Sequence, residues 1–289
     1  MRFCNHLFLS LYYYGSHPVR RWQNACRALA GRAPVMVLFY HRIADDRANA
    51  WTASQRTFFR QIRWLQQHFD LVSLAEAQKR IKSARNERPA VSITFDDGYA
   101  DNCRFALPLL IQQNIPVTYF VSTAHVLEGL PFPHDLKRGK PLTPNTPQEI
   151  QDLAEQGVEI GAHTRTHANL GRMRDPDRLW NELAGAKNDL EQLTGKSVRY
   201  FAFPYGQHAN LSSAAFRTAH QCGYEAVCSA YGGFNFPGDD PFHLQRIHAD
   251  DDMVQLKNWT TVDPRKIKKS RRFAYESVGQ PTVPGAVKQ

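Results

Sequence analysis

The chain has 289 residues, of which 42% are hydrophobic and 22% charged, a composition typical of a globular protein with a sizeable core. The formal net charge is +9, but the run 265–272 holds six basic residues and no acidic one, which leaves +3 for the remainder. No base-reading or base-stacking pattern accompanies this run, which argues against nucleic acid as a partner. Five cysteines without a Cys-x-x-Cys pair argue against a disulfide framework and against a cysteine zinc site.

The first 33 residues are predicted to form a basic and aromatic extension ahead of the main domain. Residues 7–14 are almost entirely apolar or aromatic, but the stretch is too short to span a bilayer and lacks a small-residue cleavage site. Arginines follow it at positions 20, 21, 27 and 32. We expect an amphipathic helix that packs on the domain, with attachment to a membrane surface as the second interpretation. A cytoplasmic or membrane-peripheral location is expected accordingly.

From residue 34 onward, predicted strands alternate with predicted helices. Apolar runs predict strands over 34–40, 91–95, 115–121, 158–162, 197–203, 224–229 and 242–247. Helical spacing predicts a helix opened by Ser54, helices over 74–82, 148–156 and 211–221, a helix over 101–113 with a break at Pro108, and the longest helix over 175–193. This alternation indicates parallel βαβ units, and hence a barrel or a doubly wound sheet. We place this domain at 34–260 and a basic, flexible tail at 261–289.

Polar side chains follow several of these strands directly. In a parallel α/β barrel the C-terminal strand ends converge on one face, where active sites are built. Asp-Asp-Gly alone is ordinary turn chemistry, but an aspartate together with two histidines four residues apart is a three-ligand set for a divalent metal that leaves positions open for water and substrate. The sequence therefore predicts a metal-dependent active site formed by His41, Asp96-Asp97, His163, His167 and Pro204-Tyr205-Gly206.

The same residues carry a family resemblance. The segment Thr94–Tyr99 resembles the first motif of the polysaccharide deacetylases, the NodB-homology carbohydrate esterases, and His163–His167 resembles their second motif. The segment Phe201–Gly206 is similar to the third motif in the form seen among deacetylases of β-1,6-linked glucosamine polymers, and Tyr40-His41 matches an element of that branch. The resemblance covers roughly residues 34–250.

This resemblance implies a distorted (β/α) barrel of about seven parallel strands. It implies a metal-dependent hydrolase that removes N-acetyl groups from a polysaccharide or oligosaccharide, in exopolysaccharide biosynthesis. Asp96 would be the general base, and the Tyr205 N–H, which follows Pro204, would line an oxyanion hole. The metal ligands would be Asp97, His163 and His167, with zinc as the expected metal and cobalt or nickel as alternatives.

Two positions depart from the family pattern. The third motif often carries an arginine that orients the base, and Ala202 occupies that position here. Arg246, at the end of a predicted strand, is the preferred substitute, and Arg199 is the alternative. The late Leu-x-His element that supplies the general acid is not evident either, so His41 and His248 remain the two candidates for the acid.

Two other functions stay open at this point. The same barrel can hydrolyse an amide in a small non-sugar molecule, which a closed pocket would favour over a groove rimmed by Tyr and Trp. A carbohydrate-binding homologue with weak catalysis is the other alternative, although binding alone needs no base and the aspartates and histidines are all present. The expected partner is an N-acetylated glycan. The basic run adds a peripheral contact with an anionic membrane or polymer as a further alternative.

Overall fold

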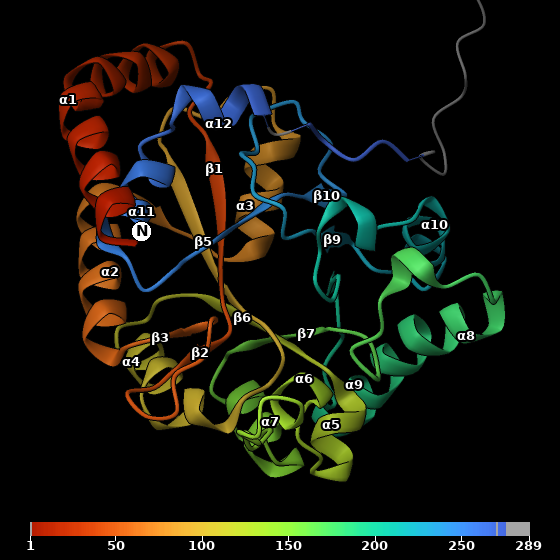
Figure 1. Cartoon of the computed structure of the whole chain (residues 1–289). Helices are drawn as coiled ribbons and strands as arrows, with labels where there is room; N and C mark the ends of the chain where they lie inside the picture. Colours follow the sequence, from red (N-terminus) through yellow and green to blue (C-terminus); the bar gives the residue numbers. More distant parts are fainter. Residues whose placement is uncertain (1, 270, 276–289) are drawn as a thin grey trace, which may run out of the picture.

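The structure is a computed structural model that describes residues 2–269 and 271–275. Its main sheet contains β1 (Val35–Tyr40), β4 (Asp70–Leu71), β5 (Ala90–Phe95), β6 (Val117–Val121), β7 (Glu159–Ala162), β8 (Tyr200–Ala202), β9 (Ala226–Cys228), β10 (His243–Leu244) and β11 (Arg246–His248). The strand order is β10-β9-β8-β7-β6-β5-β1-β11, with β4 added on β5, and each pair is parallel. Figure 1 shows the sheet curling around a centre, with helices on the outside.

One chain segment closes this sheet into a distorted barrel. β10 pairs with β9 and β11 pairs with β1, and only Gln245 separates the two strands. When β10 and β11 are counted as one interrupted strand, the eight strands of the main order become seven. The predicted fold class, a (β/α) barrel of the NodB type, is confirmed.

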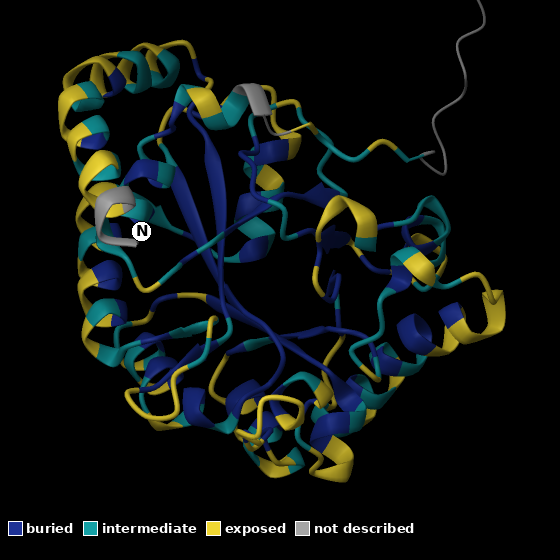
Figure 2. Ribbon diagram, in the orientation of Figure 1, coloured by how far each residue is buried: buried dark blue, intermediate teal, exposed yellow. Residues whose placement is uncertain are grey.

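The strands are buried on both faces because the barrel interior covers one face and helices cover the other. Every residue of β1 and of β5 is buried, and Figure 2 shows the strands as the dark blue centre of the molecule. The register sets Tyr40 beside Phe95 and Val121 beside Ala162. The polar residues that follow these strands therefore emerge at the same end of the barrel.

The outer helices agree with the sequence in most places. α2 (Gln55–His68) is capped by Ser54, whose side chain accepts from the Thr57 N–H, and α3 is Leu74–Lys82. The predicted helix 101–113 is split into a 3₁₀ turn (Ala100–Arg104) and α4 (Ala106–Gln112), so the break precedes Pro108, which is tolerated in a first helical turn. The remaining helices of the barrel include α5 (Thr123–Glu128), α6 (Pro133–Leu136), α7 (Pro147–Glu155) and α10 (Ser213–Gln221), and a small separate sheet pairs β2 (Arg42–Ile43) with β3 (Thr52–Ala53).

The helix predicted as the longest is not the longest one. α8 (Pro176–Trp180) runs through a π-helical turn (Asn181–Gly185) into α9 (Ala186–Thr194). The longest described helix is α1 (Arg2–Leu29), with 28 residues. No helix in the described part of the chain is both long and apolar enough to cross a bilayer, and α1 is no exception because polar residues recur along it.

The segment predicted as a flexible basic tail packs on the fold as far as it is described. It follows α11 (Met253–Thr260) and contains α12 (Pro264–Lys269). The Arg265 guanidinium lies 3.3 Å from the centre of the Tyr12 ring, and the Lys266 ammonium lies 3.2 Å from that of Trp259. Both cations therefore make cation–π contacts, which cannot be predicted from the composition of the run. Residues 270 and 276–289 of this predicted tail lie outside the described residues.

Candidate active site

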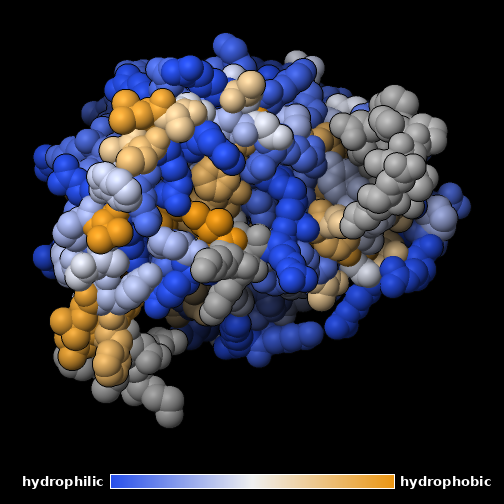
Figure 3. Space-filling model, turned by 90° about the horizontal axis from the view of Figure 1, so that it is seen from above, coloured by the Kyte–Doolittle hydropathy of each residue, from blue (hydrophilic) through white to orange (hydrophobic). Residues whose placement is uncertain are grey.

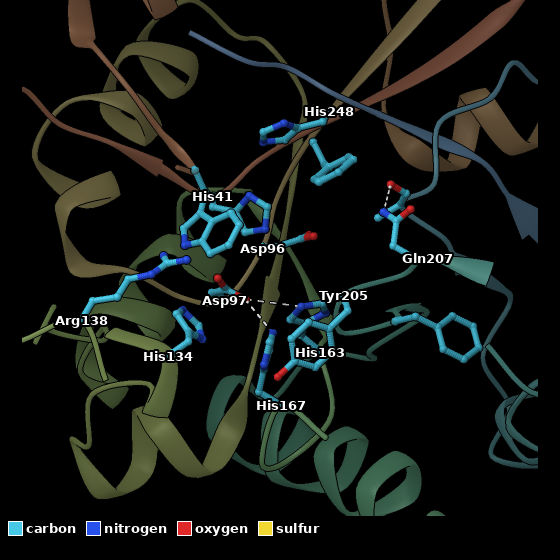
Figure 4. Close-up of a pocket in the computed structure, with 14 residues that line it drawn as sticks. His41, Asp96, Asp97, His134, Arg138, His163, His167, Tyr205, Gln207 and His248 are labelled. Carbon is cyan, nitrogen blue, oxygen red and sulfur yellow. Dashed lines mark hydrogen bonds and ion pairs between the residues drawn. The ribbon is translucent and has the colours of Figure 1, made fainter. Parts of the chain in front are cut away.

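The residues predicted from the strand ends surround one cavity of about 430 Å³ (Figure 4). Its walls are formed by Phe39, His41, Trp51, Asp96, Asp97, His134, Arg138, His163, His167, Phe203, Tyr205, Gln207, Ala230 and His248. Seven of the predicted site residues are among them. Arg246 lies directly behind Asp96, whereas Pro204 only precedes the wall residue Tyr205.

The backbone around the cavity adopts conformations that are rare for residues with a side chain. The φ angles are +76° at Asp97, +61° at Thr164, +55° at His167 and +62° at Tyr205. The left-handed region is unfavourable for a residue with a Cβ and especially for a β-branched threonine. Four such residues around one cavity fit the tendency of strained backbone to cluster at functional sites.

Asp97, His163 and His167 are arranged as a metal site. The Asp97 Oδ1 atom lies 3.4 Å from His163 Nε2 and 3.2 Å from His167 Nε2, and one ligand atom from each residue fits within 4.8 Å of the others. Tetrahedral ligands at about 2.1 Å from a zinc ion are separated by about 3.4 Å. The spacing therefore suits a small divalent cation bound between them.

The hydrogen bonds of His163 support the same assignment. Its Nδ1 lies 2.7 Å from the Ala202 carbonyl oxygen, which can only accept, so Nδ1 carries the proton and a neutral ring leaves Nε2 with a free lone pair. Asp97 Oδ1 is buried and has no hydrogen-bond partner among the described residues. Acceptor lone pairs that converge in a buried site need a cation between them, and these residues fit one.

A residue that the sequence did not single out holds the turn between the two histidines. Glu182 is buried, and its carboxylate accepts from the N–H groups of Arg165 and Thr166, both at 2.9 Å, and from the Thr166 hydroxyl at 2.6 Å. Glu182 lies in the π-helical turn. Such turns are rare and often occur at functional sites, but a sequence without an alignment gives no local signal for them.

Arg246 is the arginine that contacts the predicted base. Its guanidinium donates two parallel hydrogen bonds to the Asp96 carboxylate, at 2.6 and 2.7 Å, and also bonds Thr94 and the carbonyl of Ser229. Both Arg246 and Asp96 are buried. Burial alone would raise the pKa of Asp96, but the charge and hydrogen bonds of Arg246, together with His163 and His41, outweigh burial, so that the pKa lies below its usual value. Asp96 is therefore held ionised and in a fixed orientation.

Arg199, the alternative, is not at the cavity. It directly precedes β8, whereas the cavity lies beyond the C-terminal ends of the strands, and it pairs with Glu159. Ala202, in the position where the family often has arginine, contributes its carbonyl to His163 instead. The charge supplied by one strand in the family pattern thus comes from another strand here.

The two candidate acids lie next to each other. The rings of His41 and His248 are 5.6 Å apart, and His248 Nδ1 is 2.6 Å from a carboxylate oxygen of Asp250. Desolvation of the His41 ring lowers its pKa to about 4, against the opposite effect of Asp97 and Asp96. His41 Nδ1 has no hydrogen-bond partner in the described chain. At neutral pH, His41 is an uncharged ring, whereas His248 has a carboxylate beside it.

Aromatic and basic side chains form the rim of the cavity. Trp51 lies under the Arg138 guanidinium, whose central carbon is 4.6 Å from the indole centre. The Tyr205 ring is 53% exposed and packs edge-on against His167. Trp51 and Arg138 come from loops and His134 from the short helix α6, none of them in a family motif, so nothing in the sequence pointed to them. The Tyr205 amide N–H donates no hydrogen bond within the described residues, and remains available to a ligand.

Comparison with known proteins shows to which family the chain belongs. The model of the polysaccharide deacetylase family matches residues 83–227, half of the chain. The chain belongs to this family. A poly-β-1,6-N-acetyl-D-glucosamine N-deacetylase of Staphylococcus aureus is 26% identical to this deacetylase over 220 residues, which cover 72% of each chain.

Solved structures agree on the fold. IcaB from Ammonifex degensii superposes with a TM-score of 0.66 at 23% identity, covering 80% of this chain and 98% of that one. The deacetylase PplD of Streptococcus pyogenes, solved in complex with acetate, superposes with a TM-score of 0.66 at 19% identity, covering 81% and 100%. The family match includes Asp96, Asp97, His163, His167 and Tyr205 but ends before Arg246 and His248. In this polysaccharide deacetylase, the latter two are placed at the site by the barrel closure.

Proposed function

We propose that this polysaccharide deacetylase is a metal-dependent N-deacetylase that removes acetyl groups from an N-acetylated polysaccharide or oligosaccharide in exopolysaccharide biosynthesis. One observation carries the proposal: the convergence of Asp97, His163 and His167 beside an Asp96 that Arg246 holds ionised. The named substrate of the Staphylococcus aureus relative, poly-β-1,6-N-acetyl-D-glucosamine, supports the choice of glycan.

The proposed metal is zinc, held by Asp97, His163 and His167. One carboxylate and two imidazoles suit zinc, and cobalt or nickel accept the same ligands. When bound, a divalent ion supplies an acidified water and polarises the acetyl carbonyl. The carbonyl of Ala202 fixes the orientation of His163, and Glu182 fixes the turn that carries His167.

The proton is moved by residues of the chain. Asp96 takes a proton from the attacking water, since its carboxylate faces the cavity and keeps free lone pairs beside the two that Arg246 uses. The Tyr205 N–H donates to the oxyanion as the carbonyl becomes tetrahedral. Held by the strained φ at Tyr205, this donor is in place before the substrate arrives.

His248 is the proposed general acid. The leaving amine needs a proton, and His248 lies at the cavity wall with its Nδ1 2.6 Å from the Asp250 carboxylate. His41, with its pKa lowered to about 4, is uncharged at neutral pH and is better suited to hydrogen bonding with the substrate. Substituting each histidine by glutamine separates the roles: loss of the acid lowers kcat, whereas loss of a substrate contact raises KM.

The rim favours a sugar over a small non-sugar amide. Trp51 and Tyr205 line the cavity, and aromatic rings are suited to the apolar faces of sugar rings. The weak-catalysis alternative is opposed by the paired Asp96 and Arg246, which binding does not require.

The decisive experiment measures free amine released from β-1,6-linked N-acetylglucosamine oligomers by the metal-depleted chain, with and without added Zn²⁺ or Co²⁺. β-1,4-linked oligomers and a small N-acetylated amine serve as the comparison substrates, and Asp96→Asn is the control variant. We expect metal-dependent amine release that falls by about 10²–10⁴ in Asp96→Asn, the range for general acid–base catalysis. Equal rates on the small amine would favour the amidohydrolase alternative, and release unaffected by metal removal would refute the metal role.

A further inference from the structure

A second functional feature lies on α1, away from the cavity. Seven of the thirteen exposed large hydrophobic side chains of the described residues are on this one helix. Their spacing is helical, so they share the outward face. We call them the apolar stripe: Leu7, Phe8, Leu11, Tyr14, Val19, Trp22 and Leu29. Their exposed fractions range from 53% to 83%. Figure 3 shows hydrophobic surface along the left edge of the molecule, the side on which α1 lies in Figure 1.

Apart from the buried Tyr13, the inward contacts of α1 are largely polar, unlike those of an ordinary surface helix. The Tyr12 hydroxyl donates to Asp263 at 2.9 Å, the buried Arg20 donates to the Asn258 side chain at 2.8 Å, and Asn24 donates to the Thr261 carbonyl at 3.0 Å. These contacts attach the helix to α11 and to the turn before α12. Because hydrogen bonds hold the polar face against the domain, the apolar face is directed outward, where water is an unfavourable neighbour.

The charges on this side of the molecule indicate what kind of partner the apolar stripe binds. Neither α1 nor α2, which lie on the same side of the molecule, contains an aspartate or a glutamate. The exposed arginines of these two helices include Arg21 on α1 and Arg56, Arg60 and Arg63 on α2. A second copy of the chain would bring the same arginines face to face in a two-fold interface. An apolar face on a side of the molecule that presents arginines matches the interface of an anionic membrane instead.

We infer that α1 binds this deacetylase to the surface of an anionic lipid membrane through the apolar stripe. The helix lies in the plane of the membrane, with the aliphatic and aromatic side chains among the acyl chains and the arginines at the headgroups. The stripe shares no residue with the cavity walls. Membrane attachment therefore does not alter the chemistry on a soluble substrate.

The test is sedimentation of the full chain with vesicles, made either of phosphatidylcholine alone or of phosphatidylcholine and phosphatidylglycerol in equal parts. We expect the chain to sediment with the anionic vesicles and less with the neutral ones, and to be released as salt rises. The double variant Phe8→Asp/Leu11→Asp is expected to bind at least about tenfold more weakly, because both side chains lose their burial in lipid. The matched control, Leu127→Asp/Trp180→Asp, alters two exposed hydrophobic side chains on other helices and is expected to bind like the wild type.

Three results would overturn the inference. The first is a wild type that binds neither kind of vesicle. The second is a control variant that loses binding as much as the stripe variant does. The third is a wild type that is a dimer in buffer together with a stripe variant that is a monomer, which would make the stripe an interface between copies of the chain. Turnover of soluble oligomers and far-ultraviolet circular dichroism, unchanged in all variants, establish that each of them is folded.

Discussion

Two fully buried arginines show how differently the two ends of this molecule use buried charge. Arg246 donates two hydrogen bonds to Asp96, whose carboxylate lines the cavity. Arg20, equally buried, bonds the neutral Asn258 and comes no closer than 4.0 Å to a carboxylate oxygen of Asp263. The first arginine orients the proposed base, and the second attaches a helix. Burial of a charge is thus no sign of catalysis until its partner is seen to face a cavity.

The largest effect is expected from loss of the proposed metal ligands. Asp97→Ala or His163→Ala should abolish stoichiometric zinc binding and all measurable activity, because each removes one of three converging ligand atoms. The fold should survive, since these residues follow the strands. The measurement is zinc content after dialysis against a weak chelator. His134→Ala, which also lines the cavity, is the control and should retain its zinc. One zinc per chain in both ligand variants would place the site elsewhere.

The next effect concerns pH. Arg246 holds the pKa of Asp96 below its ordinary value in spite of burial. This carboxylate therefore contributes stability above the unfolded pKa of about 3.9, and the contribution is lost as pH falls through the lower folded value. In Arg246→Gln burial is no longer offset, so the pKa rises and the acid limb of kcat/KM should move to higher pH. Arg246→Lys keeps a positive charge beside Asp96, so its acid limb should lie between those of the wild type and of Arg246→Gln.

Loss of the Arg246 partner also has a stability cost of about 3–5 kcal/mol, the usual range for a broken buried pair. Each variant therefore needs an unfolding curve before its pH profile is interpreted. An acid limb that stays in place in a folded Arg246→Gln variant would show that Asp96 does not titrate as the base.

A smaller effect should follow from Glu182. The Glu182 carboxylate touches no proposed ligand directly and acts only through the turn that carries His167. We expect Glu182→Gln to weaken zinc binding by about 10–100-fold, as loss of a ligand-orienting contact does. Excess zinc should then restore kcat. Glu191→Gln, on the neighbouring helix α9, is the matched control. Unchanged affinity in Glu182→Gln would mean that the turn keeps its shape without the carboxylate.

The sequence predicted the barrel and most of the cavity because those features depend on local patterns. Asp96, Asp97, His163 and His167 occur in short motifs, and parallel strand ends must converge. Arg246 was found by the same rule, since it lies at a strand end. Glu182, Trp51 and Arg138 were missed because they reach the site only through tertiary packing, from a π-helical turn and from loops.

The two ends of the chain were harder to predict for a different reason. A helical pattern in α1 indicates which residues share a face but not which face is turned to the protein. The sequence favoured packing on the domain, which the structure shows, but most of the large apolar residues of the pattern are exposed, whereas Tyr13 is buried. The basic run was expected in solvent, yet Arg265 and Lys266 lie on aromatic rings. Cation–π contacts between residues that are far apart along the chain cannot be predicted from a single sequence.

The smallest effect compares the two faces of α1. Arg20→Met keeps the apolar stem but removes the hydrogen bonds to Asn258, and should reduce the free energy of unfolding by about 1.5–3 kcal/mol, the range for bonds to a charged group. Trp22→Ser, at a side chain that is 68% exposed, should change it by no more than about 0.5 kcal/mol. Denaturant unfolding of both variants, without lipid, measures the difference. If Trp22→Ser were the more destabilising variant, the outward face would be packed against protein in solution, and the contrast between the two buried arginines would no longer describe how α1 is held.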